Sequence, residues 1–111
     1  MELKTEKLAD DISEVVIDGR LDASNAQSVE KQIQELIGSG QTRIIFNLSE
    51  LVYISSAGLR VLITTIKLLK VKQGNLVLFG LKENIEEILK VSGFTRLFNI
   101  QQNKEDAIAQ F

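Results

Sequence analysis

The chain has 111 residues, a length that predicts a single domain spanning residues 1–111. Its formal net charge of -2 is spread along the chain, which leaves neither the concentrated basic face of a nucleic-acid-binding protein nor a polybasic segment for a membrane surface. Because the chain contains no cysteine and no histidine, disulfides and zinc–thiolate sites are excluded, and the commonest general base of enzymes is missing.

The first third of the chain predicts a hairpin followed by a helix. Leu3–Leu8 and the apolar run Val15–Ile17 are strand candidates joined by a short polar turn. Ser24 and Gln27 have the spacing of a capping box, which predicts the start of a helix that ends near Gly38. The apolar face of this helix is formed by Ala26, Val29, Ile33, Leu36 and Ile37.

The middle of the chain predicts a second strand and the most apolar helix. The run Ile44–Phe46, followed by Leu48, is continuously apolar, which is typical of a strand covered on both faces. The helix after it ends near Gly74. Its apolar stripe is formed by Leu59, Leu62, Ile63, Ile66 and Leu69.

The last third repeats this alternation. Leu76–Phe79 predicts a third continuous strand, and the helix after it stops at Gly93. Leu97–Ile100 predicts a short edge strand, and Lys104–Ala109 predicts a last short helix behind Asn103. The alternation of strands and helices predicts an α/β sandwich with a largely parallel or mixed sheet flanked by about four helices.

Functional sites in such sheets tend to lie where strands end and helices begin. That rule points to two junctions, Asp22–Ser24 and Asn47–Gly58. Within the second junction, Ser55 and Ser56 open the most apolar helix, where one serine suffices as the N-cap. The small residues Ala57 and Gly58 then leave a serine hydroxyl accessible to a partner's active site.

The start of a helix is a favourable place for a phosphate, because free N–H groups and the positive end of the dipole stabilise negative charge. A phosphoserine adds a charge of about -1.5 to -2 at neutral pH. We therefore expect phosphorylation here to leave the fold intact and to change surface contacts. Serine catalysis is not expected, since a nucleophile elbow needs a base, no histidine is present, and no lysine is placed by the sequence to act as one. The sequence thus predicts a binding protein rather than an enzyme.

The same helix carries a second apolar row, Val61, Thr65 and Leu68, bordered by Arg60 and Lys67. This row has two interpretations. It is either additional core packing, as in helices that are apolar all round, or a modest partner-binding stripe beside the serines.

Other classes of function lack their motifs. The chain has no P-loop and no Gly-x-Gly-x-x-Gly after a strand, and it lacks the acidic cluster of a response-regulator receiver. The pairs Asp10–Asp11 and Glu86–Glu87 are typical of a turn and a solvated helix face, so neither a metal nor a cofactor is expected. The sequence shows no signal peptide and no apolar run of about 20 residues, which predicts a cytoplasmic location.

Five motifs in order along the chain resemble the anti-sigma factor antagonist (anti-anti-sigma factor) family of STAS domains. They are Gly19–Asp22, Ile45–Ser49, Tyr53–Leu59, Leu78–Leu81 and Thr95–Phe98. The Ser-Ser-Ala-Gly-Leu element after a strand is the most specific of them. The resemblance implies a STAS-type sandwich, with a sheet of four or five strands flanked by helices.

The resemblance also implies a bacterial partner-switching regulator of transcription. In that scheme the unphosphorylated antagonist binds an anti-sigma factor that is also a serine kinase of the GHKL ATPase fold, and the sigma factor is released. The kinase phosphorylates the antagonist, which ends the complex, and a PP2C-type phosphatase restores it. The implied phosphoacceptor is Ser56. The implied partner surface consists of Asp22, Ser55, Ser56, Ala57, Gly58, Arg60 and Val61.

The chain departs from the common family pattern at three positions. Ser55 and Asn47 stand where aspartate is frequent, and Arg60 replaces a small residue. The adjacent hydroxyl makes Ser55 an alternative acceptor, and Arg60 is placed either to pair with the phosphate or to read acidic groups of a partner. We expect a monomer or weak dimer. Two further roles stay open, each with a target other than a sigma factor: a structural scaffold, which would self-associate stably, and a ligand-binding regulatory domain.

Overall fold

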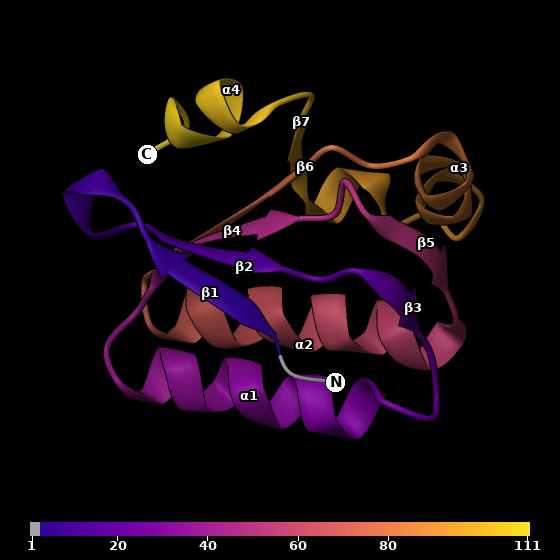
Figure 1. Cartoon of the computed structure of the whole chain (residues 1–111), viewed down its shortest axis with the longest axis horizontal. Coiled ribbons are helices and arrows are strands. Elements are labelled where there is room, and N and C mark those ends of the chain that lie inside the picture. The colour runs from indigo at the N-terminus through magenta and orange to yellow at the C-terminus, as the bar shows by residue number, and fades with distance from the viewer. Residues whose placement is uncertain (1–2) are drawn as a thin grey trace.

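A computed structural model describes residues 3–111 (Figure 1). The main sheet has five strands in the order β1-β2-β4-β6-β7, and a second sheet pairs β3 with β5. The strands are β1 (Lys4–Lys7), β2 (Ser13–Val16), β3 (Gly19–Leu21), β4 (Arg43–Asn47), β5 (Leu51–Ile54), β6 (Asn75–Phe79) and β7 (Asn99–Gln101). The helices are α1 (Ala26–Gly38), α2 (Ser56–Val71), α3 (Glu83–Val91) and α4 (Lys104–Ile108).

The main sheet is mixed. Strand β1 runs antiparallel to β2, and β2, β4, β6 and β7 run parallel to one another. The predicted N-terminal hairpin is confirmed: a 3-10 turn at Ala9–Asp11 joins its strands, and the Leu8 N–H donates to the Ile12 carbonyl oxygen over 2.7 Å. This five-stranded sheet with four helices confirms the α/β sandwich predicted from the sequence.

Both faces of the main sheet are covered, with α1 and α2 on one side and α4 on the other (Figure 1). Along β4, the side chains of Ile44 and Phe46 pack into the larger core with α1 and α2, whereas Ile45 packs with Ala107 of α4. Because alternate side chains of a strand point to opposite faces, a strand buried on both faces needs an unbroken apolar run. The continuous runs in the sequence are thereby explained.

An ion pair between a half-buried lysine and a buried glutamate attaches α4 to the sheet. Lys104 Nζ lies 2.9 Å from Glu14 Oε1, and the Glu14 side chain is only 5% exposed. The other carboxylate oxygen of Glu14 accepts from Asn47 Nδ2 over 3.0 Å, so both oxygens have partners. Asn47 in turn accepts hydrogen bonds from the main chain and hydroxyl of Ser49. An aspartate at position 47 would set a second carboxylate against Glu14, which explains the asparagine there.

The prediction of a capping box at the start of α1 is wrong. The helix begins at Ala26, and Ser24 instead donates to the Asp22 carboxylate from its N–H and its hydroxyl. Asn25 occupies the N-cap position, but its side chain bonds the preceding loop. Ser24, which the sequence pattern placed at the helix start, therefore belongs to the short loop after β3.

The C-terminal elements are confirmed with shifted bounds. Residues Thr95–Leu97 form a 3-10 turn, so the edge strand starts at Asn99 rather than at Leu97. Asn103 Oδ1 accepts from the Asp106 N–H over 2.8 Å and so caps α4. Within residues 3–111, no helix combines the length and the apolar character needed to span a membrane.

Candidate functional site

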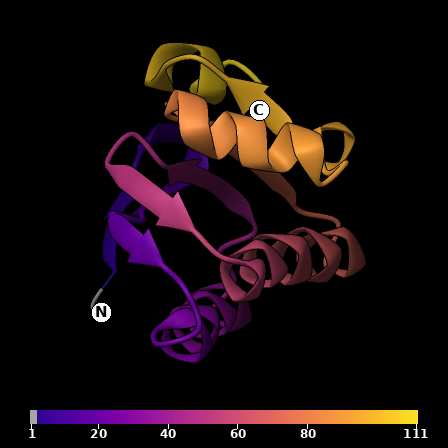
Figure 2. The same ribbon diagram turned by 90° about the vertical axis from the view of Figure 1, so that its right-hand side faces the viewer.

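The second sheet brings the two predicted junctions together. Strands β3 and β5 are parallel, and Leu21 pairs with Ile54 at the ends of both strands. The main-chain N–H of Ser55 donates to the Leu21 carbonyl oxygen over 3.0 Å. Figure 2 shows the two strands side by side, with the chain leaving them toward α1 and α2. The Asp22 loop and the start of α2 therefore form one site at one edge of this sheet.

Gly58 permits this close approach. A Cβ atom at position 58 would lie 2.5 Å from the Leu21 carbonyl oxygen and 2.7 Å from Cγ1 of Ile54. Such distances are shorter than real Cβ contacts, so any other residue would push α2 away from β3. The glycine of the Ser-Ser-Ala-Gly-Leu element is thus required by packing.

The two serines have different structural roles. Ser55 is the N-cap of α2, with extended backbone angles, and its hydroxyl oxygen accepts from the Gly58 N–H over 3.3 Å. Ser56 is the first residue of the helix and is exposed. Within residues 3–111, the Ser56 hydroxyl makes no hydrogen bond to the protein. The half-buried Ser55 therefore stabilises the helix, while the Ser56 hydroxyl is exposed to solvent.

The Asp22 loop presents a fixed carboxylate beside this serine. Asp22 Oδ1 accepts from the Ser24 hydroxyl over 2.6 Å and from the Ser24 N–H over 3.0 Å. Hydrogen bonding from Ser24 is the main cause that lowers the pKa of the Asp22 carboxyl, and Arg20 adds to it. Asn25 holds the loop by accepting from the Asp22 N–H and donating to the Arg20 carbonyl oxygen. The site thus carries an ionised carboxylate that pairs with Arg20 over 3.4 Å, on a loop held by hydrogen bonds.

The Arg20–Tyr53 stack is a feature that the sequence did not predict. The guanidinium carbon of Arg20 lies 4.3 Å from the centre of the Tyr53 ring. Tyr53 is 37% exposed and its neighbour Val52 is 49% exposed. These side chains belong to β5, which the sequence did not predict as a separate strand. The one available signal was that Tyr53 is the single tyrosine of a chain poor in aromatic residues.

The second row of α2 packs in the core, and Val61 has almost none of its side chain exposed for the partner surface predicted from the sequence. Val61 and Thr65 are each only 2% exposed, and Thr65 Oγ1 donates to the Val61 carbonyl oxygen. This burial follows because α1 packs along α2 while the sheet covers its other side. Arg60, by contrast, is exposed and lines a groove of about 350 Å³ between α1 and α2.

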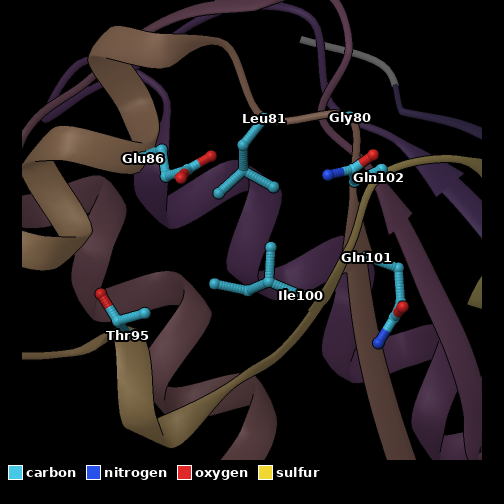
Figure 3. A pocket seen from close by; sticks show the side chains of 7 residues that line it. All are labelled: Gly80, Leu81, Glu86, Thr95, Ile100, Gln101 and Gln102. Carbon is cyan, nitrogen blue, oxygen red and sulfur yellow. The ribbon is translucent and has the colours of Figure 1, made fainter.

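A second depression lies at the carboxyl ends of β6 and β7, beside α3 (Figure 3). Leu81 and Ile100 face each other across it, and its polar groups include the Glu86 carboxylate and the Gln102 amide. Its volume is about 500 Å³. Among the described residues, no group of three or more acidic side chains is arranged to hold a metal ion.

The model of the STAS domain family matches residues 5–107, and the chain belongs to this family. BtrV of Bordetella bronchiseptica, an anti-sigma factor antagonist by name, is 37% identical over 95 residues, covering 86% of this chain and 82% of BtrV. A solved structure named as an anti-sigma factor antagonist of Thermotoga maritima has a TM-score of 0.92 at 22% identity, covering 97% of this chain and 92% of that one. The Bacillus cell fate determinant SpoIIAA, in its phosphorylated form, has a TM-score of 0.75 at 20% identity and 98% coverage of both chains. The family indicated by the sequence motifs is confirmed.

Proposed function

We propose that this protein is an anti-sigma factor antagonist whose binding is switched by phosphorylation of Ser56. The observation that carries the proposal is the division of roles between the serines, since Ser55 is engaged as the cap and Ser56 is exposed with a free hydroxyl. Unphosphorylated, the protein binds an anti-sigma factor that is also a serine kinase of the GHKL ATPase fold, and the sigma factor is released. Because its proposed role is to regulate bacterial transcription, we place the protein in the cytoplasm.

The switching step is a phosphoryl transfer. Ser56 Oγ attacks the γ-phosphorus of the ATP held by the partner kinase, ADP leaves, and the hydroxyl proton passes to the partner or to solvent. The product places a charge of about -1.5 to -2 at the first residue of α2, where the helix dipole stabilises it. A PP2C-type phosphatase reverses the step by hydrolysis, which releases inorganic phosphate.

The charge of the site explains why the modification ends the complex. The Asp22 carboxylate already carries a negative charge on the adjacent loop. A partner that contacts both the Asp22 loop and the start of α2 meets the Asp22–Arg20 ion pair before phosphorylation, and an additional charge of about -1.5 to -2 afterwards. The role named for BtrV and the existence of SpoIIAA in a phosphorylated form support this proposal.

The direct test is incubation of the protein with its cognate kinase and ATP, followed by intact-protein mass measurement and fragmentation. We expect one phosphate on Ser56, no product from Ser56→Ala, and normal modification of Ser55→Ala. Phosphate on Ser55 in the wild-type protein would assign the acceptor to the alternative serine. Absence of any phosphate with an active kinase would contradict the switching mechanism.

A ligand-binding regulatory role is the second candidate, and the depression beside Leu81 and Ile100 is the observation that favours it. Its mixed lining, with apolar Leu81 and Ile100 and polar Glu86 and Gln102, suits a small amphipathic molecule. Thermal shift measurements with a panel of nucleotides and lipids test this role. A scaffold role would require stable self-association, so light scattering coupled to size exclusion distinguishes it from the monomer or weak dimer proposed here.

A further inference from the structure

We propose that Arg60 is the intramolecular receptor of the Ser56 phosphate, so that phosphorylation also removes a positive charge from the groove between α1 and α2. This inference rests on the proposed phosphorylation of Ser56 and specifies how that modification acts on the partner surface. It assigns a regulatory role to Arg60, which stands where the common family pattern has a small residue.

The helix register places Arg60 one turn after Ser56. Both residues lie in the continuous helix α2, four positions apart, and both are exposed. Residues at this spacing are neighbours on one helix face. Side chains of a helix also lean toward its N-terminus, so a long side chain covers the turn that precedes it. A guanidinium at position 60 can therefore reach the turn that contains Ser56.

Arg60 is available for such a pairing. Within residues 3–111, its guanidinium forms no ion pair and no hydrogen bond. The other arginine of the site, Arg20, is already engaged by the Asp22 carboxylate at 3.4 Å and by the Tyr53 ring. Arg60 is thus an uncommitted cation one turn from the serine on the same helix.

The chemistry favours this pair once a phosphate is present. A guanidinium presents two parallel N–H groups that match two phosphate oxygens, and such charge-assisted bonds are stronger than neutral ones. Before phosphorylation the Ser56 hydroxyl is neutral and does not attract the guanidinium, so the Arg60 side chain lines the groove. The pairing therefore forms only in the modified state.

The consequence extends beyond Ser56. Arg60 lines the groove together with Gln27 and Glu30 of α1. When its guanidinium turns to the phosphate, Glu30 remains as the charged group of that lining. A partner surface complementary to an arginine and a glutamate then meets a groove whose charge is negative. One modification thereby alters two neighbouring parts of the contact surface.

The test measures the second ionisation of the phosphate. Phosphoserine is installed at position 56 by genetic encoding, which needs no kinase, and its ³¹P chemical shift is titrated between pH 4 and pH 9, a range of about two to three units on either side of the phosphate pKa. We expect Arg60→Gln to raise the phosphate pKa by about half a unit, because a nearby cation favours the dianion. Arg60→Lys should retain part of the effect.

The matched control is Lys67→Gln, which removes an exposed cation from the same helix further from Ser56. It should leave the phosphate pKa unchanged. Equal pKa values in the Arg60→Gln and Lys67→Gln proteins would overturn the inference. Because the phosphoserine is encoded, failure of the kinase to modify Ser56 would contradict the proposed function while leaving this result readable, and the two failures are distinguishable.

Discussion

The main-chain N–H of Ser55 donates a hydrogen bond to the carbonyl oxygen of Leu21 over 3.0 Å. This bond joins the residue that follows β5 to the last residue of β3, so the helix that starts with Ser56 is positioned relative to the Asp22 loop. The same carbonyl oxygen lies against Gly58. The geometry of the proposed partner surface therefore depends on close packing between α2 and β3, and that packing can be tested residue by residue.

Gly58→Ala is expected to destabilise the protein by about 1–3 kcal/mol, because the added methyl group overlaps the Leu21 carbonyl oxygen. Gly38→Ala is the matched control, since nothing lies within 4 Å of a Cβ at that helical position. It should be neutral or stabilise by up to about 1 kcal/mol. Urea denaturation measures both, and equal stabilities for the two variants would contradict the packing role of Gly58.

The division of roles between the serines predicts different effects on stability. Ser55→Ala removes the N-cap oxygen that accepts from Gly58 and should cost about 0.5–2 kcal/mol. Ser56→Ala removes an exposed hydroxyl without a hydrogen bond to the described residues and should change the free energy of unfolding by less than about 0.5 kcal/mol. Chemical denaturation measures the free energy of unfolding of both variants. A larger loss of stability in Ser56→Ala than in Ser55→Ala would contradict the assignment of Ser55 as the N-cap.

The low pKa of the Asp22 carboxyl depends chiefly on hydrogen bonds from Ser24. We expect Ser24→Ala to raise this pKa toward its ordinary value, while Ser28→Ala in α1 leaves it unchanged. A carboxyl with a lowered folded-state pKa stabilises the protein above its unfolded-state pKa, and this contribution is lost as the pH falls through the folded value. Carboxyl ¹³C chemical shifts titrated by NMR provide the measurement, and an unaltered Asp22 pKa in Ser24→Ala would contradict the account.

The ion pair of Lys104 with the buried Glu14 predicts an alkaline loss of stability. Lys104→Met leaves the Glu14 carboxylate with Asn47 as its remaining partner and should cost about 1–3 kcal/mol at neutral pH. Hydrogen bonding to Glu14 raises the pKa of Lys104 above 10.5. A base with a raised folded-state pKa stabilises fully below its unfolded-state pKa, so this contribution fades as the pH rises above 10.5.

The control for this pair is Lys7→Met, which breaks an exposed ion pair with Asp11 and should change stability by less than about 1 kcal/mol. Denaturant unfolding at neutral pH and near pH 11, about half a unit above the ordinary lysine pKa, compares the variants with the wild type. If Lys104→Met were no less stable than Lys7→Met at neutral pH, the ion pair with Glu14 would not hold α4 in place.

Much of the fold could be predicted because its strongest signals are local. Continuous apolar runs such as Ile44–Phe46 identify strands covered on both faces, and the apolar stripe of α2 identifies the central helix. Strand β5 was missed because its exposed Val52 and Tyr53 lie side by side between buried residues, a pattern with neither strand nor helix periodicity.

The features that were not predicted depend on tertiary contacts. Asn25 replaces Ser24 at the helix start because the Asp22 loop takes the serine as a hydrogen-bond donor. Val61 is buried because α1 and the sheet both pack against α2, which no helical pattern reveals. The pairing of Glu14 with Lys104 joins opposite ends of the sequence. The motif around Ser56 was recognisable from sequence, whereas the different roles of Ser55 and Ser56 required the structure.

The most direct test of the account is the affinity of the cognate anti-sigma kinase for this protein with serine and with phosphoserine at position 56, measured by isothermal titration calorimetry without ATP. We expect phosphoserine to weaken binding at least about tenfold, or about 1.4 kcal/mol. Equal affinity for the two forms would contradict partner switching at Ser56.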